Sequence, residues 1–101
     1  MVFKKKPREL TIPPLAQTDP GAVELVRVWA THGQQHVTIA VDSWQDPAAW
    51  GIMLVDLARH VANYYAENRA MRRDHVLARI KEIFDAEWQS PTSEAKGSVI
   101  Q

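Results

Sequence analysis

The fold of this chain is decided by the stretch VELVRVWATHGQQHVTIAVDSW, residues 23–44. Its first part is rich in β-branched and aromatic side chains and has no helical periodicity. The run THGQ follows, in which Gly33 supplies the positive φ that a tight turn often needs. In the run after it, Val37, Ile39 and Val41 alternate with other residues and so share one face of a strand. The stretch therefore predicts a β-hairpin.

A helix is predicted downstream of the hairpin. Asp46 and Pro47 form a helix start signal, because an Asp carboxylate caps free N–H groups and proline suits the first helical turn. We expect this helix to run to about Glu67. Its apolar stripe contains Trp50, Met53, Leu54, Leu57, Ala58, Val61, Tyr64 and Tyr65. Val55 and Ala62 widen the apolar arc on one side, so the helix is expected to have more than one packing partner.

A second helical pattern runs from about residue 71 to residue 89. When about 100° per residue is carried through both patterns, its stripe is rotated by roughly 120° from the first stripe. One straight helix cannot present both stripes to one core. We therefore predict a break near Asn68, with Asp74 as a new N-cap.

The two ends differ from the middle in composition. Residues 1–21 contain four prolines, which disfavour a helix and predict an extended N-terminal arm. Residues 91–101 predict a disordered C-terminal tail. Residues 22–90 then form a single α+β domain, a β-hairpin packed on two α-helices in the order ββαα.

An isolated two-stranded hairpin is marginal in water, so something must complete it. A third strand from residues 9–12, the two helices packed on one face, or a second chain would each do so. Homodimerisation through a strand edge or the broad helix face follows as a hypothesis.

Composition bounds the chemistry of this 101-residue chain, which has no cysteine and equal numbers of basic and acidic residues. Thiol catalysis and disulfides are excluded. No apolar run reaches the roughly 20 residues that span a bilayer, and no signal peptide is visible, so we expect a cytoplasmic protein without membrane contact. The scattered glycines form no phosphate-binding fingerprint, and we expect no cofactor. His32 and His36 lack the further ligands that a metal site needs, so no metal site is expected.

The charges are unevenly distributed. Lys4, Lys5, Lys6 and Arg8 lie together at the N-terminus, whereas residues 9–66 carry an acidic excess. An acidic folded centre argues against nucleic-acid binding, because phosphate contacts dominate such affinity. Binding of a polyanion by the basic arm stays open as an alternative.

The candidate functional residues lie at the hairpin exit and on the first helix. Trp44 and Trp50 form an aromatic pair that would anchor a partner or line a small pocket, whereas Trp29, Trp50 and Trp88 are expected to pack in the core. Ile52 lies among polar residues and Val55 on the outer arc, which makes both candidate contact points.

An enzymatic alternative uses the polar side of the first helix. Asp56 lies four residues before His60, where a carboxylate orients an imidazole, and Arg59 lies beside them. The parts of a catalytic set beyond this pair are absent from the sequence, so no catalytic residue is assigned.

The runs ELVRVW (24–29), DPAAWG (46–51) and LARHVAN (57–63) resemble a small bacterial family known as a domain of unknown function in short proteins. The resemblance covers about residues 9–66. It implies a bacterial soluble protein and carries no activity. It directs attention to Trp50, Gly51, Arg59, His60 and Asn63.

Taken together, these patterns predict a protein–protein interaction or assembly module, a homo-oligomer or the partner of another protein. A small-ligand protein or enzyme built on Asp56, Arg59 and His60 is the alternative from a different class.

Overall fold

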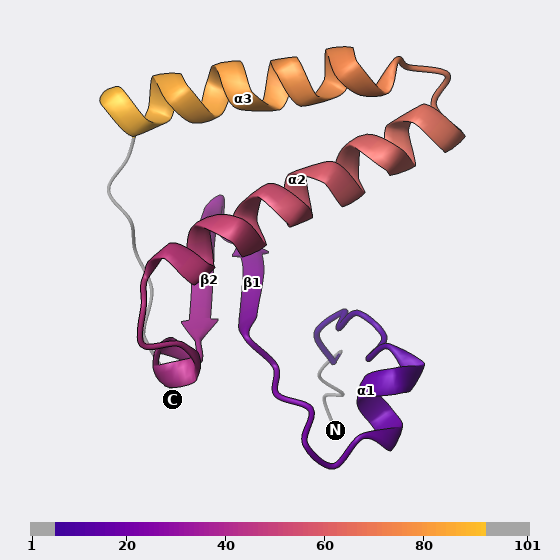
Figure 1. The fold of residues 1–101 in the computed structure, drawn as a ribbon, viewed down its shortest axis with the longest axis vertical. Coiled ribbons are helices and arrows are strands. Elements are labelled where there is room, and N and C mark those ends of the chain that lie inside the picture. The colour runs from indigo at the N-terminus through magenta and orange to yellow at the C-terminus, as the bar shows by residue number, and fades with distance from the viewer. Residues whose placement is uncertain (1–5, 93–101) are drawn as a thin grey trace, which may run out of the picture.

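The structure is a computed structural model that describes residues 6–92. The elements in chain order are α1 (Pro14–Thr18), β1 (Val26–Thr31), β2 (Gln34–Ile39), the 3-10 turn η1 (Val41–Ser43), α2 (Ala48–Asn68) and α3 (Arg73–Gln89) (Figure 1). The α+β class and the order ββαα are thereby confirmed. The predicted tail beyond residue 92 and the start of the basic run, Lys4 and Lys5, lie outside the described residues.

The short helix α1 corrects the expectation that the proline-rich arm contains no helix. Pro13 precedes α1, and Pro14 is its first residue. A proline at this position loses nothing, because the first N–H groups of a helix have no intrahelical partner. The backbone N–H groups of Ala16 and Gln17 both donate to the Pro13 carbonyl, at 2.9 and 3.1 Å. Pro13 and Pro14, which we interpreted as evidence against a helix, therefore stand at the start of one.

The hairpin forms as predicted. β1 and β2 pair antiparallel, with Val26 opposite Ile39 and Val28 opposite Val37. The turn consists of His32 and Gly33, whose φ angles of 52° and 71° are both positive. Such a turn twists in the sense that the two flanking strands require. Within residues 6–92 the sheet has two strands, so residues 9–12 do not add a third one.

The helix boundaries follow from local hydrogen bonds. Asp46 caps α2, since its Oδ1 accepts a hydrogen bond of 2.9 Å from the Ala48 N–H. The predicted break is confirmed, because α2 ends at Asn68 and α3 begins at Arg73. The predicted N-cap is wrong, since Arg72 occupies that position and Asp74 lies within the first turn of α3. Neither proline nor glycine causes the break. Ala70 lies instead in the left-handed region, with φ 53°, and turns the chain back.

The two long helices pack against each other through small side chains. Ala62 is completely buried and Val76 on α3 is 7% exposed. They are the buried hydrophobic residues among those described. Asn63 and Arg73 add a polar link, in which Arg73 Nε donates to Asn63 Oδ1 at 2.6 Å. Ala62, which widens the apolar arc of α2, is therefore enclosed between α2 and α3.

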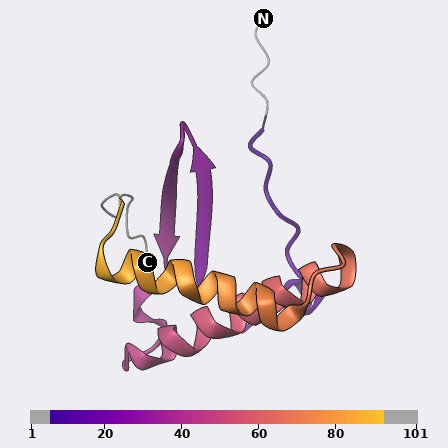
Figure 2. The same cartoon turned by 90° about the horizontal axis from the view of Figure 1, so that it is seen from above.

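The hairpin does not pack on the helices of its own chain. Among the described elements, β1 and β2 contact each other, α2 and α3 contact each other, and no strand approaches either helix closely. Figure 2 shows the hairpin projecting away from the layer formed by α2 and α3. The expected packing of the hairpin on two helices is therefore not realised within one chain, although the order of the elements is as predicted.

Candidate interaction surfaces

The predicted apolar stripe of α2 forms an exposed surface rather than a core. We call its exposed members the α2 outer face: Leu54, Leu57, Val61, Tyr64 and Tyr65. Leu57, in its middle, is 53% exposed. Stepping about 100° per residue places these side chains on one arc of the helix, beside the small residues that meet α3. Helix α2 therefore buries alanine against its own chain and leaves its large apolar residues open.

The hairpin carries a second apolar surface, the hairpin apolar face, made of Val26, Val28, Val37 and Ile39. Residues directly opposite in an antiparallel pair share a face, and so do alternate residues along each strand. Val28 at its centre is 55% exposed. A sheet with one apolar face normally packs that face against another layer. In this chain no helix provides that layer.

The predicted aromatic pair is brought together. The rings of Trp44 and Trp50 lie 4.8 Å apart in an edge-to-face arrangement with an interplanar angle of 73°. This is a favourable aromatic geometry. Trp88 corrects the core expectation, because it is 72% exposed. It stacks on Phe84, with the ring centroids 5.7 Å apart.

The other predicted site residues do not converge on one pocket. Ile52 and Val55 are exposed, as their candidate role as contact points requires. Arg59 lies 3.7 Å from Asp56, in an exposed ion pair within α2. His60 is exposed beside them. Asn63 is engaged by Arg73 of α3 and so joins the two helices.

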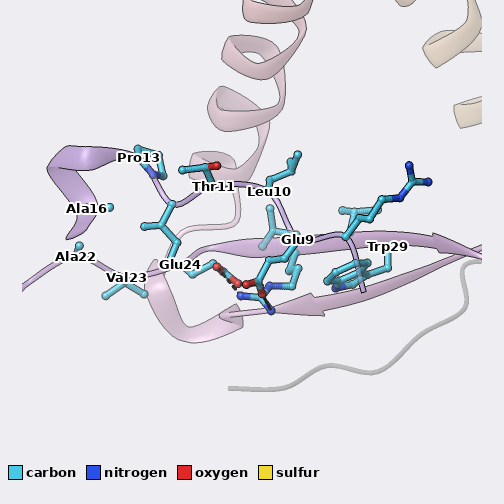
Figure 3. Close-up of a pocket in the computed structure, with 14 residues that line it drawn as sticks. Glu9, Leu10, Thr11, Pro13, Ala16, Ala22, Val23, Glu24 and Trp29 are labelled. Atoms are coloured by element: carbon cyan, nitrogen blue, oxygen red, sulfur yellow. Dashed lines mark hydrogen bonds and ion pairs between the residues drawn. The ribbon is translucent and has the colours of Figure 1, made fainter. Parts of the chain in front are cut away.

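A hollow with a volume of about 550 Å³, which the sequence did not predict, lies between the N-terminal arm and β1. Leu10, Ile12, Val23 and Trp29 are among its lining residues, which come from the arm and from β1 (Figure 3). Residues 9–12 were considered as a third strand of the hairpin; they lie beside β1 but do not pair with it as a strand.

Arg27 fastens the arm to β1. Its guanidinium lies 2.9 Å from Glu9 Oε2 and donates two hydrogen bonds to Glu24, of 2.8 and 3.0 Å. These hydrogen bonds lower the pKa of the Glu24 carboxyl and, reciprocally, raise the pKa of Arg27. Both groups lie at the surface, so the cluster positions the arm and contributes little to stability.

Residues 6–92 contain no group of three or more His, Asp or Glu side chains arranged to hold a metal ion. In the same part of the chain, none of the helices has the length and apolarity to cross a membrane.

The family model of a domain of unknown function, DUF5076, matches residues 9–92, and the chain belongs to this family. The resemblance stated from residues 9–66 is thereby confirmed, and the match also includes α3. Among curated proteins none matches the chain.

Four chains of solved structures match. One comes from the photosynthetic bacterium Rhodopseudomonas palustrus CGA009 and is described provisionally as a pyruvate dehydrogenase. It is 33% identical to this chain with a TM-score of 0.76, and the alignment covers 97% of this chain and 100% of that one.

Proposed function

We propose that this protein is a protein–protein interaction or assembly module whose first partner is a second copy of the same chain. The observation that carries the proposal is the inversion of the usual burial pattern. Large apolar side chains on every element except β2 and η1 are exposed, whereas Ala62 and Val76 are buried. Contiguous exposed apolar surface on a folded chain marks an interaction site.

The total surface supports the same conclusion. The chain exposes 9457 Å², whereas a compact monomer of 11.5 kDa exposes about 5,800 Å². The excess is about 3,700 Å², and part of it belongs to the extended arm. A small two-helix unit with so small a core gains stability from association.

The description of the Rhodopseudomonas protein as a pyruvate dehydrogenase points to another class, a protein that binds or acts on a small molecule. Under that alternative, Asp56, Arg59 and His60 would contact the small molecule. It predicts a binding or turnover that His60→Ala abolishes while leaving the unfolding free energy nearly unchanged. Equal loss of folding would mark His60 as a structural residue.

Native mass spectrometry combined with sedimentation velocity tests the module. We expect twice the chain mass at micromolar concentration, with no additional bound mass. A monomer at high micromolar concentration overturns the proposal, and a monomer that retains a stoichiometric small molecule favours the alternative class.

The contribution of the exposed helix positions is tested separately. Ile52→Asp and Val55→Asp are expected to weaken the association, with Leu15→Asp on the exposed side of α1 as the matched control. If both α2 variants associate as the parent does, these two positions are not part of the contact.

A further inference from the structure

Two apolar surfaces of this chain are not covered by a helix or a sheet of the described residues, and they complement each other in kind. On the hairpin apolar face Val28 is exposed, Val26, Val37 and Ile39 are half-buried, and Val26 and Val28 line the hollow beside the N-terminal arm. The hairpin apolar face consists of β-branched side chains on a two-stranded sheet, and the α2 outer face is the apolar side of a long helix. An α+β domain is normally built by laying such a sheet on such a helix. Within one chain the two are separate.

The hairpin strands and the α2 outer face have similar lengths. The α2 outer face runs from Leu54 to Tyr65, which at the helical rise of 1.5 Å per residue is about 16 Å. Strand β1, from Val26 to Thr31, is about 16 Å long at roughly 3.3 Å per residue. The hairpin apolar face occupies about 7 Å of that strand, from Val26 to Val28, so one hairpin covers about half of one outer face.

The separation of hairpin and helices is built into the connection between them. The Ser43 N–H and hydroxyl both bond to the Ala40 carbonyl, at 3.1 and 2.8 Å. The Asp46 carboxylate then caps α2 through the Ala48 N–H at 2.9 Å. These hydrogen bonds give the connection a defined local structure, and with it the hairpin and α2 make no contact with each other.

The radius of gyration of one chain is close to that of a compact dimer. The Cα radius of gyration is 16.4 Å. A compact chain of this length has about 12.7 Å, whereas a compact body of twice as many residues has about 16.5 Å. One copy thus extends through the radius that two compactly combined copies would occupy. Two compact monomers placed side by side would instead each have the smaller radius.

We propose that two copies of this protein exchange their hairpins, so that the hairpin apolar face of one copy packs on the α2 outer face of the other. This inference rests on the proposed function and specifies its geometry. By two-fold symmetry the contact occurs twice, and each copy receives from its partner the layer that its own chain does not supply. The packing of hairpin on helix that the sequence predicts is then completed between chains.

Cysteine cross-linking tests this geometry, because the chain contains no cysteine of its own. Val28→Cys is introduced at the centre of the hairpin apolar face and Leu57→Cys at the centre of the α2 outer face, in separate chains of different length. The two are mixed, allowed to re-equilibrate and oxidised. A disulfide requires Cβ atoms about 3.5–4.5 Å apart, so Leu54→Cys and Val61→Cys extend the helix panel by a turn in each direction.

We expect the mixed disulfide between the hairpin cysteine and one of the helix cysteines to form several times faster than either like-with-like disulfide. Leu15→Cys, on α1, is the control and should form the mixed product only at the background rate. Circular dichroism identifies any variant that fails to fold, and the neighbouring position in the panel then replaces it.

The outcomes separate this inference from the proposed function. A dimer that forms only Leu57–Leu57 disulfides pairs helix on helix, and one that forms only Val28–Val28 disulfides pairs hairpin on hairpin. Either result overturns hairpin exchange and leaves the assembly module standing. A monomer by sedimentation overturns both.

Discussion

Leu57→Ala tests how much the α2 outer face contributes to the free energy of association. Complete burial of a leucine side chain contributes about 1.5–3 kcal/mol. Because Leu57 is still 53% exposed in the single chain, about half of that amount, roughly 0.8–1.6 kcal/mol per copy, remains to be gained on association. A two-fold symmetric dimer contains the residue twice, which doubles the effect. Alanine keeps the β-carbon, so we expect the dimer dissociation constant to rise about 10- to 100-fold.

The assay is sedimentation equilibrium over a concentration series, with circular dichroism to establish that the variant retains its helices. Leu15→Ala is the matched control, because Leu15 is 84% exposed on α1 and lies outside both apolar surfaces. It should leave the dissociation constant within about 2-fold of the parent, as surface substitutions generally do. Equal effects of the two variants, or no effect of Leu57→Ala on a dimer that does form, would refute the reasoning.

Three further predictions concern the fold itself, and urea unfolding of each variant beside the parent protein checks them. Gly33→Ala should destabilise the protein by about 1–2 kcal/mol, because the φ of Gly33 is positive. Gly51 lies within α2 with open space around it, so Gly51→Ala should stabilise the protein by about 0.5–1 kcal/mol. A change of the same sign in both variants would contradict this. Ala62→Leu should cost about 1–3 kcal/mol, since it forces apart two helices that meet at a completely buried alanine. The hydrogen bond from Arg27 lowers the pKa of Glu24 from 4.5, so the ionised carboxylate favours folding above pH 4.5, and this contribution is lost as the pH falls through the folded-state pKa. Glu24→Gln should therefore make stability less dependent on pH below 4.5, and an unchanged pH profile would argue against a role for this contact.

The elements that depend on local sequence could be predicted. The turn at His32 and Gly33, the cap at Asp46 and the break after Asn68 each follow from a few neighbouring residues. Helix α1 was missed because Pro13 and Pro14 were counted by type, whereas their effect depends on whether they stand inside a helix or at its first turn.

The burial of the helices could not be predicted to the same extent. Periodicity shows which residues share a face, but it does not show what covers that face. Leu57 and Trp88 were expected in a core and are exposed, because α2 and α3 meet through Ala62 and Val76 instead. The hydrogen bond from Arg73 to Asn63 joins residues on either side of the break, and its geometry depends on how the chain turns at Ala70.

The exposure of the site residues could not be predicted for the same reason, because periodicity does not show what covers a face. Trp44 and Trp50 are close in sequence and were correctly paired. Residues 9–12 were considered as a third strand, but they lie beside β1 without pairing with it and leave a hollow there, which no local pattern in the sequence indicates.

The pairing of neighbouring elements has a kinetic consequence. Both sets of contacts within the described chain, β1 with β2 and α2 with α3, join segments that follow each other directly. Hairpins of either kind form within microseconds, because little chain entropy is lost in closing short connections. If the stable state requires a second chain, the slow event is then the encounter of two partly ordered molecules. We therefore expect the refolding rate of this protein to rise with its concentration. In the newly synthesised chain, association with a partner, and not folding within the chain, should limit how long the protein stays partly unfolded.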